Sequence, residues 1–148
     1  MKTRIPPPVI LLGFGIAMWW LAGHASAYVV SIPILVSAVI AAMGVAVAAA
    51  GVLEFSRART TVNPHRINDA SALVMGGVYR WTRNPMYVGL LLVLVAWMLW
   101  LGAMSNLVIL LLFVVAITEL QIKPEEQALA KRFGDEYDAY CRRVRRWF

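Results

Sequence analysis

The chain has 148 residues, of which 61% are hydrophobic and only 15% are charged, and its mean hydropathy is +0.69. Soluble domains are usually about 45–50% apolar and about 25% charged. This composition therefore excludes an ordinary soluble domain and predicts a single membrane domain over residues 1–148. The net charge is +6, but the basic residues stand beside apolar stretches, which indicates anchoring at a membrane rather than nucleic-acid binding.

Two long uncharged stretches predict the membrane spans. Between residues 5 and 53 only His24 can carry a charge near neutral pH, and residues 84–118 contain no Asp, Glu, Lys or Arg. A spanning helix needs about 20 apolar residues. We expect spans at about 8–23, 28–53, 85–101 and 105–122, with a cytosolic segment over 54–84.

The predicted fold is all-α, an integral membrane helical bundle with four transmembrane helices and a C-terminal amphipathic cytosolic helix over 124–148. The N-terminal apolar run, followed by "ASA", is similar to a signal peptide. The tandem Trp19 and Trp20 favour an interfacial anchor instead. We therefore expect this run to be retained as the first span.

The orientation follows from the basic residues. Lys and Arg occur in residues 2–4, in the 54–83 segment and in the tail "RRVRRW", whereas the connections near 24–27 and 101–106 have none. Basic loops stay inside, so both termini are expected on the cytoplasmic side of a bacterial inner membrane. The aromatic residues expected at the outer interface are Trp19, Trp20, Tyr28, Trp97 and Trp100.

Small residues mark one face of the second span. In "AAMGVAVAAAG", Ala42, Ala46 and Ala50 recur every four residues, as do Gly44 and Ala48. Such spacing allows helix backbones to approach closely in lipid. We expect this face to pack either inside the bundle or in a homodimer, and we expect Gly13 and Gly15 of the first span to act in the same way.

The last 25 residues carry an amphipathic pattern. The apolar face consists of Leu129, Phe133, Tyr137, Tyr140, Val144 and Trp147, spaced by three or four residues as in one face of a helix. Gly134 is a predicted bend. Two arrangements fit the pattern: a helix lying on the membrane surface, or a helix that folds back over the 54–87 segment and closes a pocket.

The turn "TRNPMY" starts the third span. Asn84 is a good N-cap and Pro85 is favoured at the first helical position. The turn can be a helix start alone, with Arg83 as a basic anchor and Tyr87 as an interfacial aromatic residue. It can also be an anion site, because a helix N-terminus attracts anions and an arginine adds a planar fork for a carboxylate or phosphate.

The segment "ELQIKPEEQALAKRFG" leaves the fourth span. Pro124 is expected to open a new helix with Glu125 and Glu126 in its first turn, where the helix dipole stabilises anions. Glu119 lies inside the apolar span, and acidic residues at membrane depth are candidates for function. A hairpin of the last two spans would bring these residues together with Arg83 and Tyr87. Such a site suits a zwitterionic or cationic ligand and a lipophilic partner.

These two segments resemble the isoprenylcysteine carboxyl methyltransferase family and the related phospholipid N-methyltransferases. The matching residues are Gly77, Tyr79, Arg83, Pro85, Tyr87 and Gly89, then Glu125, Glu126 and Leu129, then Phe133, Gly134, Tyr137 and Tyr140. The resemblance covers most of residues 54–148, and the two motifs in this order are fairly specific. Asn84 stands where the family more often has histidine.

The resemblance implies an integral membrane methyltransferase that uses S-adenosylmethionine and a lipophilic acceptor, a carboxylate, an amine or a thiol. It implies Arg83 and Glu126 as catalytic residues. The implied cofactor-binding residues are Gly77, Val78, Tyr79, Asn84, Pro85, Tyr87, Glu125 and Glu126. No metal site is expected, because His24 and His65 fall on opposite sides of the predicted membrane without neighbouring ligands.

The alternative is a non-enzymatic small membrane protein, a transporter subunit or scaffold, whose polar turn binds lipid headgroups. A headgroup patch favours uniform basic charge, whereas a pocket for a zwitterionic cofactor needs both signs. The glutamate pair beside the arginine turn favours the enzyme. The expected partners are membrane lipids and a lipophilic substrate, and the choice between a monomer and a homodimer stays open.

Overall fold

The computed structural model describes residues 5–25, 30–58 and 72–148, and within these ranges the chain is helical without a β-strand. The predicted all-α class is thus confirmed for the described residues. The elements are α1 (Pro7–Ala25), α2 (Ile34–Arg57), the short 3-10 helix η2 (Gly77–Arg80), α3 (Pro85–Leu101), the 3-10 helix η3 (Met104–Asn106), α4 (Leu107–Ile117), the π-turn η4 (Thr118–Ile122), α5 (Lys123–Phe133) and α6 (Asp135–Arg143). Tyr28, Arg59, His65 and Arg66 lie outside the described residues.

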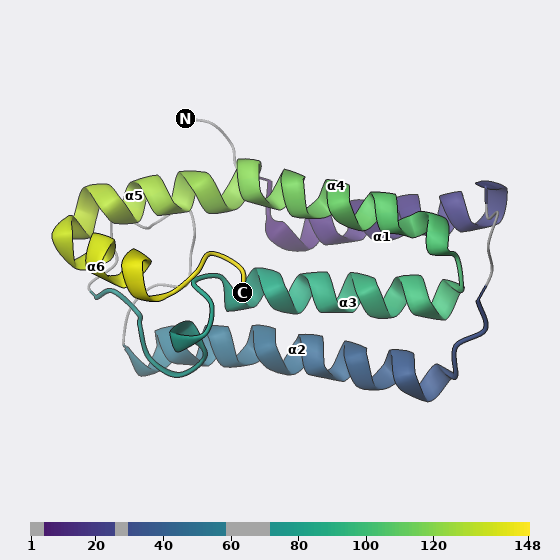
Figure 1. Cartoon of the computed structure of the whole chain (residues 1–148), viewed down its shortest axis with the longest axis horizontal. Helices are drawn as coiled ribbons and strands as arrows, with labels where there is room; N and C mark the ends of the chain where they lie inside the picture. The colour runs from purple at the N-terminus through teal and green to yellow at the C-terminus, as the bar shows by residue number, and fades with distance from the viewer. Residues whose placement is uncertain (1–4, 26–29, 59–71) are drawn as a thin grey trace.

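Helix α3 occupies the middle of the bundle. It packs against α1, α2 and α4, and α1 also packs against α4. Figure 1 shows α2, α3 and α4 running side by side, with α5 and α6 at one end. We call the end at which α2 ends, α3 begins and α5 and α6 lie the polar end. At the other end, Gly102 adopts φ 66° and turns the chain from α3 towards α4, as the predicted hairpin requires.

Three helical segments of the described chain are long and apolar enough to cross a membrane: Pro7–His24, Ile34–Arg57 and Met104–Phe133. Helix α3 is apolar but has 17 residues. Many large apolar side chains on α1, α2 and α4 point outward, among them Leu12, Ile16, Leu35, Val45, Leu111 and Val115. Exposed apolar surface over whole helices is typical of an integral membrane protein. The fourth span remains a prediction.

The helix that contains α4 does not end where the sequence predicted. Ile122 is helical (φ −63°, ψ −52°), and one continuous helix runs from Met104 to Phe133. Pro124 therefore does not open a new helix, and Glu125 and Glu126 have no free helix N-terminus beneath them. Proline has no N–H and its ring clashes with the carbonyl four residues earlier. The wider turn over Thr118–Ile122 accommodates it without a break.

The predicted helix over 124–148 is also interrupted. Helix α5 ends at Phe133, Gly134 adopts φ 49°, and α6 ends at Arg143, after which Val144 is extended. The bend at Gly134 is confirmed, but the last residues form an extended segment rather than a helix. The first two helices differ less from their predicted bounds. Helix α1 extends slightly beyond 8–23 at both ends, and α2 begins at Ile34 rather than at 28 and continues to Arg57.

The small-residue face of α2 packs inside the bundle, against α3. A Cβ added at Gly44 would lie 2.7 Å from the carbonyl oxygen of Gly89, and one at Gly89 would lie 2.5 Å from that of Gly44 and 2.7 Å from the Ala48 Cβ. The two backbones thus touch, which only glycine permits. By contrast, a Cβ at Gly13 or Gly15 would meet nothing within 4 Å, so the prediction of close packing there is wrong.

Helix α1 packs against α4 through a pair of aromatic rings and is linked to α3 by a side-chain hydrogen bond near the middle of α1. The rings of Phe14 and Phe113 meet edge to face, with centroids 5.4 Å apart. The Trp97 indole N–H donates to the carbonyl of Gly15 at 3.1 Å. This bond links α3 to α1, where Met18 is fully buried. The core therefore lies between α1, α3 and α4, while α2 contacts α3 on the opposite side.

The contact between Gly44 and Gly89 makes a stability prediction. Gly89→Ala should lower the free energy of unfolding in detergent by about 1–3 kcal/mol, because the added methyl group must push two backbones apart. Gly13→Ala is the matched control and should be neutral, or stabilising by up to about 1 kcal/mol, because alanine favours a helix over glycine. Thermal unfolding followed by circular dichroism measures both, and equal effects would contradict the close α2–α3 contact.

Candidate functional site

A cavity of about 710 Å³ opens at the polar end of the bundle. We call it the site cavity. Its apolar walls come mainly from α2 and α3, and its polar groups come from the 79–87 turn, α5 and α6. The polar and aromatic lining residues are Phe55, Tyr79, Arg83, Asn84, Tyr87, Glu125, Glu126, Tyr137 and Tyr140. The predicted meeting of the 79–87 turn with α5 and α6 is therefore confirmed as geometry, and the C-terminal helices fold back over the turn.

Glu126 is bound by two arginines. Its Oε1 lies 3.2 Å from the Arg83 Nη2. Arg146 donates from Nε to both carboxylate oxygens, at 3.0 and 3.2 Å, and from Nη2 to Oε2 at 2.7 Å. These bonds raise the pKa of the Arg146 guanidinium above its ordinary value. Both Glu126 and Arg83 are mostly buried, so their charges are less screened than those of a surface pair.

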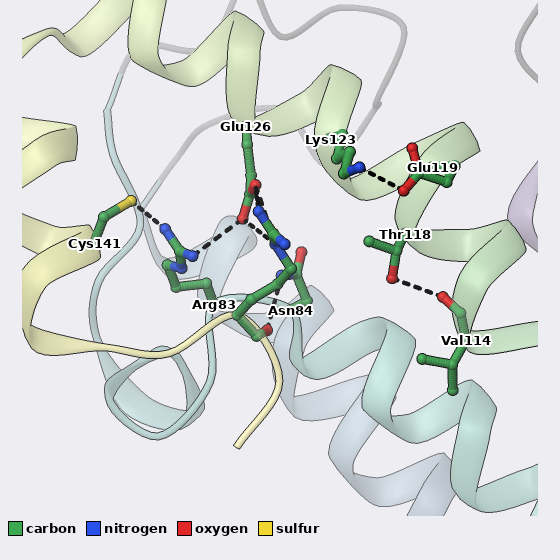
Figure 2. Close-up of polar contacts among 9 residues, drawn as sticks. Arg83, Asn84, Val114, Thr118, Glu119, Lys123, Glu126 and Cys141 are labelled. Atoms are coloured by element: carbon green, nitrogen blue, oxygen red, sulfur yellow. Dashed lines mark hydrogen bonds and ion pairs between the residues drawn. The ribbon is translucent and has the colours of Figure 1, made fainter. Parts of the chain in front are cut away.

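Arg83 is held less completely than Glu126. Its Nη1 donates to the Cys141 sulfur, and Figure 2 shows the guanidinium between Cys141 and Glu126. The Arg83 Nε is buried and has no hydrogen-bond partner. A buried guanidinium N–H without an acceptor is costly. Arg83 itself lines the site cavity, but this nitrogen lies beneath the surface.

The extended segment 144–147, which we call the C-terminal strap, is fastened to the turn before α3. The Arg83 N–H donates to the carbonyl of Arg145 at 3.0 Å. The carbonyl of Arg146 accepts from the Thr82 hydroxyl at 3.1 Å and from the Asn84 amide at 2.9 Å. Asn84 therefore precedes α3 as predicted, but its side chain does not cap the helix. It ties the strap to the site instead.

Buried tyrosines form part of the cavity wall. The Tyr87 hydroxyl donates to Glu125 Oε1 at 2.6 Å, and the Tyr140 hydroxyl donates to the carbonyl of Tyr79 at 2.8 Å. Burial raises the pKa of Tyr79, Tyr137 and Tyr140 above the ordinary value of a phenol. These side chains consequently remain neutral at physiological pH, and they present ring faces and hydroxyl donors without adding negative charge.

Gly77 shapes the turn but does not line the cavity. It is exposed and has φ 54°, and an added Cβ would lie 2.4 Å from the Glu54 Oε1. Glu54, at the end of α2, also pairs with Arg57 at 2.6 Å. The glycine is required because its backbone is left-handed and lies against a carboxylate. Phe55 then meets Tyr79 edge to face at 5.7 Å, which places the tyrosine in the wall.

Of the residues implied by the resemblance, most but not all reach the cavity. Tyr79, Asn84, Tyr87 and Glu125 line it, together with Arg83 and Glu126. Gly77, Val78 and Pro85 are not among its lining residues. Val78 follows the Gly77 turn within η2, and Pro85 is buried in the contact with α2, where a Cβ on Gly51 would meet its Cγ at 3.3 Å.

Glu119 does not join the site, so the predicted convergence of all five residues is wrong. It is exposed and pairs with Lys123 at 2.5 Å. Figure 2 shows this pair apart from Arg83 and Glu126. Glu119 precedes Glu126 by two turns of a regular helix, which would put both on one face. The π-turn at Thr118–Ile122 changes that phase.

Three contributors were not singled out by the sequence: Arg146, Cys141 and Glu54. Arg146 is one of several arginines in "RRVRRW", and nothing in that pattern separates it from its neighbours. Glu54 appeared only as a charge at the end of a span. Among the residues that the structure describes, no group of three or more His, Cys, Asp or Glu side chains is placed to hold a metal ion.

The sequence model of the phospholipid methyltransferase family matches residues 32–136. This range includes α2, α3, the arginine turn and the glutamate pair. The chain belongs to the phospholipid methyltransferase family. It is also similar to a Haemophilus influenzae (strain ATCC 51907 / DSM 11121 / KW20 / Rd) protein described as uncharacterized, with 47% identity over 62 residues, which are 42% of this chain and 98% of that protein.

Family membership implies methyltransferase activity at a membrane. The matched range contains Arg83 and Glu126, whereas Cys141 and Arg146 lie beyond its end at residue 136. The family match and the geometry therefore overlap at the ion pair between Arg83 and Glu126. The strap that holds this pair from the other side lies outside the matched range.

The strap makes a prediction about local stability. The double variant Thr82→Val, Asn84→Ala removes both donors to the Arg146 carbonyl, each worth about 0.5–1.5 kcal/mol. Trypsin should then cleave after Arg143 or Arg145 several-fold faster, while the rest of the bundle stays folded. Thr118→Val, which removes only the bond within one helix to Val114, is the control. Unchanged cleavage in the double variant would show that these bonds do not hold the strap.

Proposed function

We propose that this protein is an S-adenosylmethionine-dependent methyltransferase that acts on a lipophilic acceptor, a carboxylate, an amine or a thiol, at the cytosolic face of the bacterial inner membrane. The observation that carries the proposal is the site cavity, which combines apolar walls with both charge signs at one end. A small molecule with a carboxylate, an amino group and a positive sulfur needs such a mixture. Family membership supports the same chemistry.

The residues present fit the cofactor. Arg83, which lines the cavity, would take the amino-acid carboxylate. Glu125 and Glu126 would accept hydrogen bonds from the amino group or the ribose hydroxyls. The rings of Tyr79 and Tyr87 would face the sulfonium, with a cation–π gain of about 0.5–2 kcal/mol. When bound, the cofactor supplies a methyl group on a positively charged sulfur.

The chain's own contribution is alignment and exclusion of water. Transfer of a methyl group needs the acceptor atom held in line with the donor, and positioning alone can lower a barrier by about 7–11 kcal/mol. Leu129, Tyr137 and Tyr140 line the cavity from α5 and α6, so the two helices would act as its roof. The transfer thus depends on alignment and exclusion of water more than on acid–base groups.

A second cavity offers a place for the acceptor's hydrocarbon chain. It has a volume of about 890 Å³ and lies between α1, α2 and α3. We call it the apolar cavity. Pro8, Leu11 and Val93 line both cavities, so the two form one trough along α3. Its other residues include Ala38 and Ala41. We propose that the reacting end of the acceptor lies in the site cavity and the chain in the apolar cavity.

The non-enzymatic alternative, a headgroup-binding scaffold, has less support. A headgroup patch favours uniform basic charge on a surface, whereas Arg83 lines a cavity and is paired with Glu126. The membrane orientation belongs to the proposal. The polar end carries most of the arginines, so it is placed in the cytoplasm together with both termini.

The cofactor proposal predicts binding of S-adenosylhomocysteine, the demethylated product, to the purified protein in detergent. Glu126→Gln and Arg83→Gln should each weaken this binding by roughly tenfold or more, because charge-assisted hydrogen bonds contribute about 1.5–3 kcal/mol. Isothermal titration calorimetry measures both. Glu119→Gln is the matched control, because that glutamate lies outside the cavity, and it should leave the affinity unchanged.

Two results of these titrations would contradict the cofactor proposal. Absence of heat and of thermal stabilisation with millimolar S-adenosylhomocysteine in the wild-type protein would rule out the cofactor. Equal losses in Glu119→Gln and Glu126→Gln would show that the affinity reflects overall charge and not the site cavity.

The trough predicts that acceptors are selected by the length of their hydrocarbon chains. Ala41→Phe should fill part of the apolar cavity and raise KM several-fold for acceptors with long hydrocarbon chains, but not for short-chain analogues. Ala42→Phe adds the same bulk on an exposed face of α2 that lines neither cavity, and it should change KM for neither class of acceptor. A radiolabelled methyl-transfer assay over a series of chain lengths measures the effect, and equal sensitivity of both variants would place the chain elsewhere.

A further inference from the structure

Arg146 contacts the candidate site from outside the cavity. It is not among the residues that line the site cavity, and its side chain is 38% exposed. Its guanidinium nevertheless makes three of the hydrogen bonds to Glu126. A residue that grips a cavity-lining carboxylate from behind acts through that carboxylate and not on a ligand.

The two arginines therefore have unequal roles. Arg146 holds both oxygens of Glu126 in a planar fork, which fixes the plane of the carboxylate. Arg83 reaches only Oε1, at 3.2 Å. Glu125 and Glu126 both line the cavity, so the two carboxylates balance the two guanidiniums. Because Arg146 binds both oxygens of Glu126, Glu126 depends less on Arg83, which lines the cavity.

We infer that Arg146 is a positioning residue that neutralises and orients Glu126, and that it thereby leaves Arg83 available to the anionic group of a bound ligand. The inference rests on the proposed function, in which that group is the carboxylate of the cofactor's amino-acid part. Without Arg146, the carboxylate of Glu126 would turn to its remaining partner. Arg83 would then be paired fully within the protein, and a ligand carboxylate would have to displace Glu126.

The strap holds Arg146 in place for this role. Its carbonyl accepts from Thr82 and Asn84, and the next residue, Trp147, packs against the apolar core of the bundle. The backbone on both sides of the guanidinium is therefore fixed to elements that carry the cavity. Arg145 offers a matched comparison, because its carbonyl is used in the strap but its side chain is exposed.

The experiment compares two ligands that differ only in the carboxylate: S-adenosylhomocysteine, which has it, and its decarboxylated analogue, which keeps the amino group but lacks the carboxylate. Arg146→Ala should weaken S-adenosylhomocysteine binding by about tenfold, the value of a charge-assisted hydrogen bond. It should change binding of the decarboxylated analogue by less than about twofold. Arg146→Lys, which keeps the charge but not the fork, should fall between, and Arg145→Ala should match the wild type.

Each outcome decides the inference. A selective loss for the ligand with the carboxylate supports it. An equal loss for both ligands in Arg146→Ala and in Arg146→Lys would mean that Arg146 only maintains the fold, and no loss for either would mean that Glu126 does not need it. Failure of the wild type to bind S-adenosylhomocysteine at all would refute the cofactor proposal itself, a result separate from any effect of Arg146.

Discussion

The candidate site depends on one helix that does not stop at the point where its sequence favours a stop. From Met104 to Phe133 the chain remains helical past Pro124, so the segment that follows α4 continues in the same direction instead of turning away. Glu125 and Glu126 are therefore held by the rigidity of a long helix, opposite the turn before α3. A break at Pro124 would let the following helix take another direction, and the pairing with Arg83 would lose its geometric basis.

The course of that helix also determines which glutamate pairs with Arg83. A regular α-helix would place Glu119 and Glu126 on one face, and both would then approach Arg83. The π-turn changes the phase between them, so Glu119 faces outward and pairs with Lys123 while Glu126 faces the cavity. Buried charges are tolerated only when they are paired. The carboxylate of Glu126, shared by two arginines, meets that condition, and its neighbour Glu125 accepts a hydrogen bond from the Tyr87 hydroxyl.

The sequence supports a reliable prediction of those features that depend on local pattern. Runs without charge locate the helices, Gly134 locates the bend, and the small residues of α2 indicate a close helix contact. The contacts between residues that are distant in sequence depend on the three-dimensional structure, and the sequence does not predict them. Gly44 and Gly89 are far apart in sequence, and nothing local pairs them. Asn84 has the properties of an N-cap, but its side-chain N–H donates to the Arg146 carbonyl of the strap, and its side chain does not cap α3. Arg146 and its neighbours in "RRVRRW" are equivalent in sequence, and only the path of the strap separates them.

The packing of α1, α2 and α4 around α3 explains how a short chain can build a site at a membrane boundary. Helices α2 and α3 touch through glycine, so they form a continuous apolar wall, while α1 packs on the other side of α3 against α4. A trough is thereby left along α3, with its polar groups confined to one end. In lipid, polar groups are costly unless they are satisfied, and here the ion pairs, the tyrosine hydroxyls and the strap satisfy nearly all of them. The Arg83 Nε and, beside the apolar cavity, the Ser37 Oγ are buried without a partner. The Arg83 guanidinium pairs with Glu126 at the wall of the site cavity, and its positive charge there favours a ligand carboxylate.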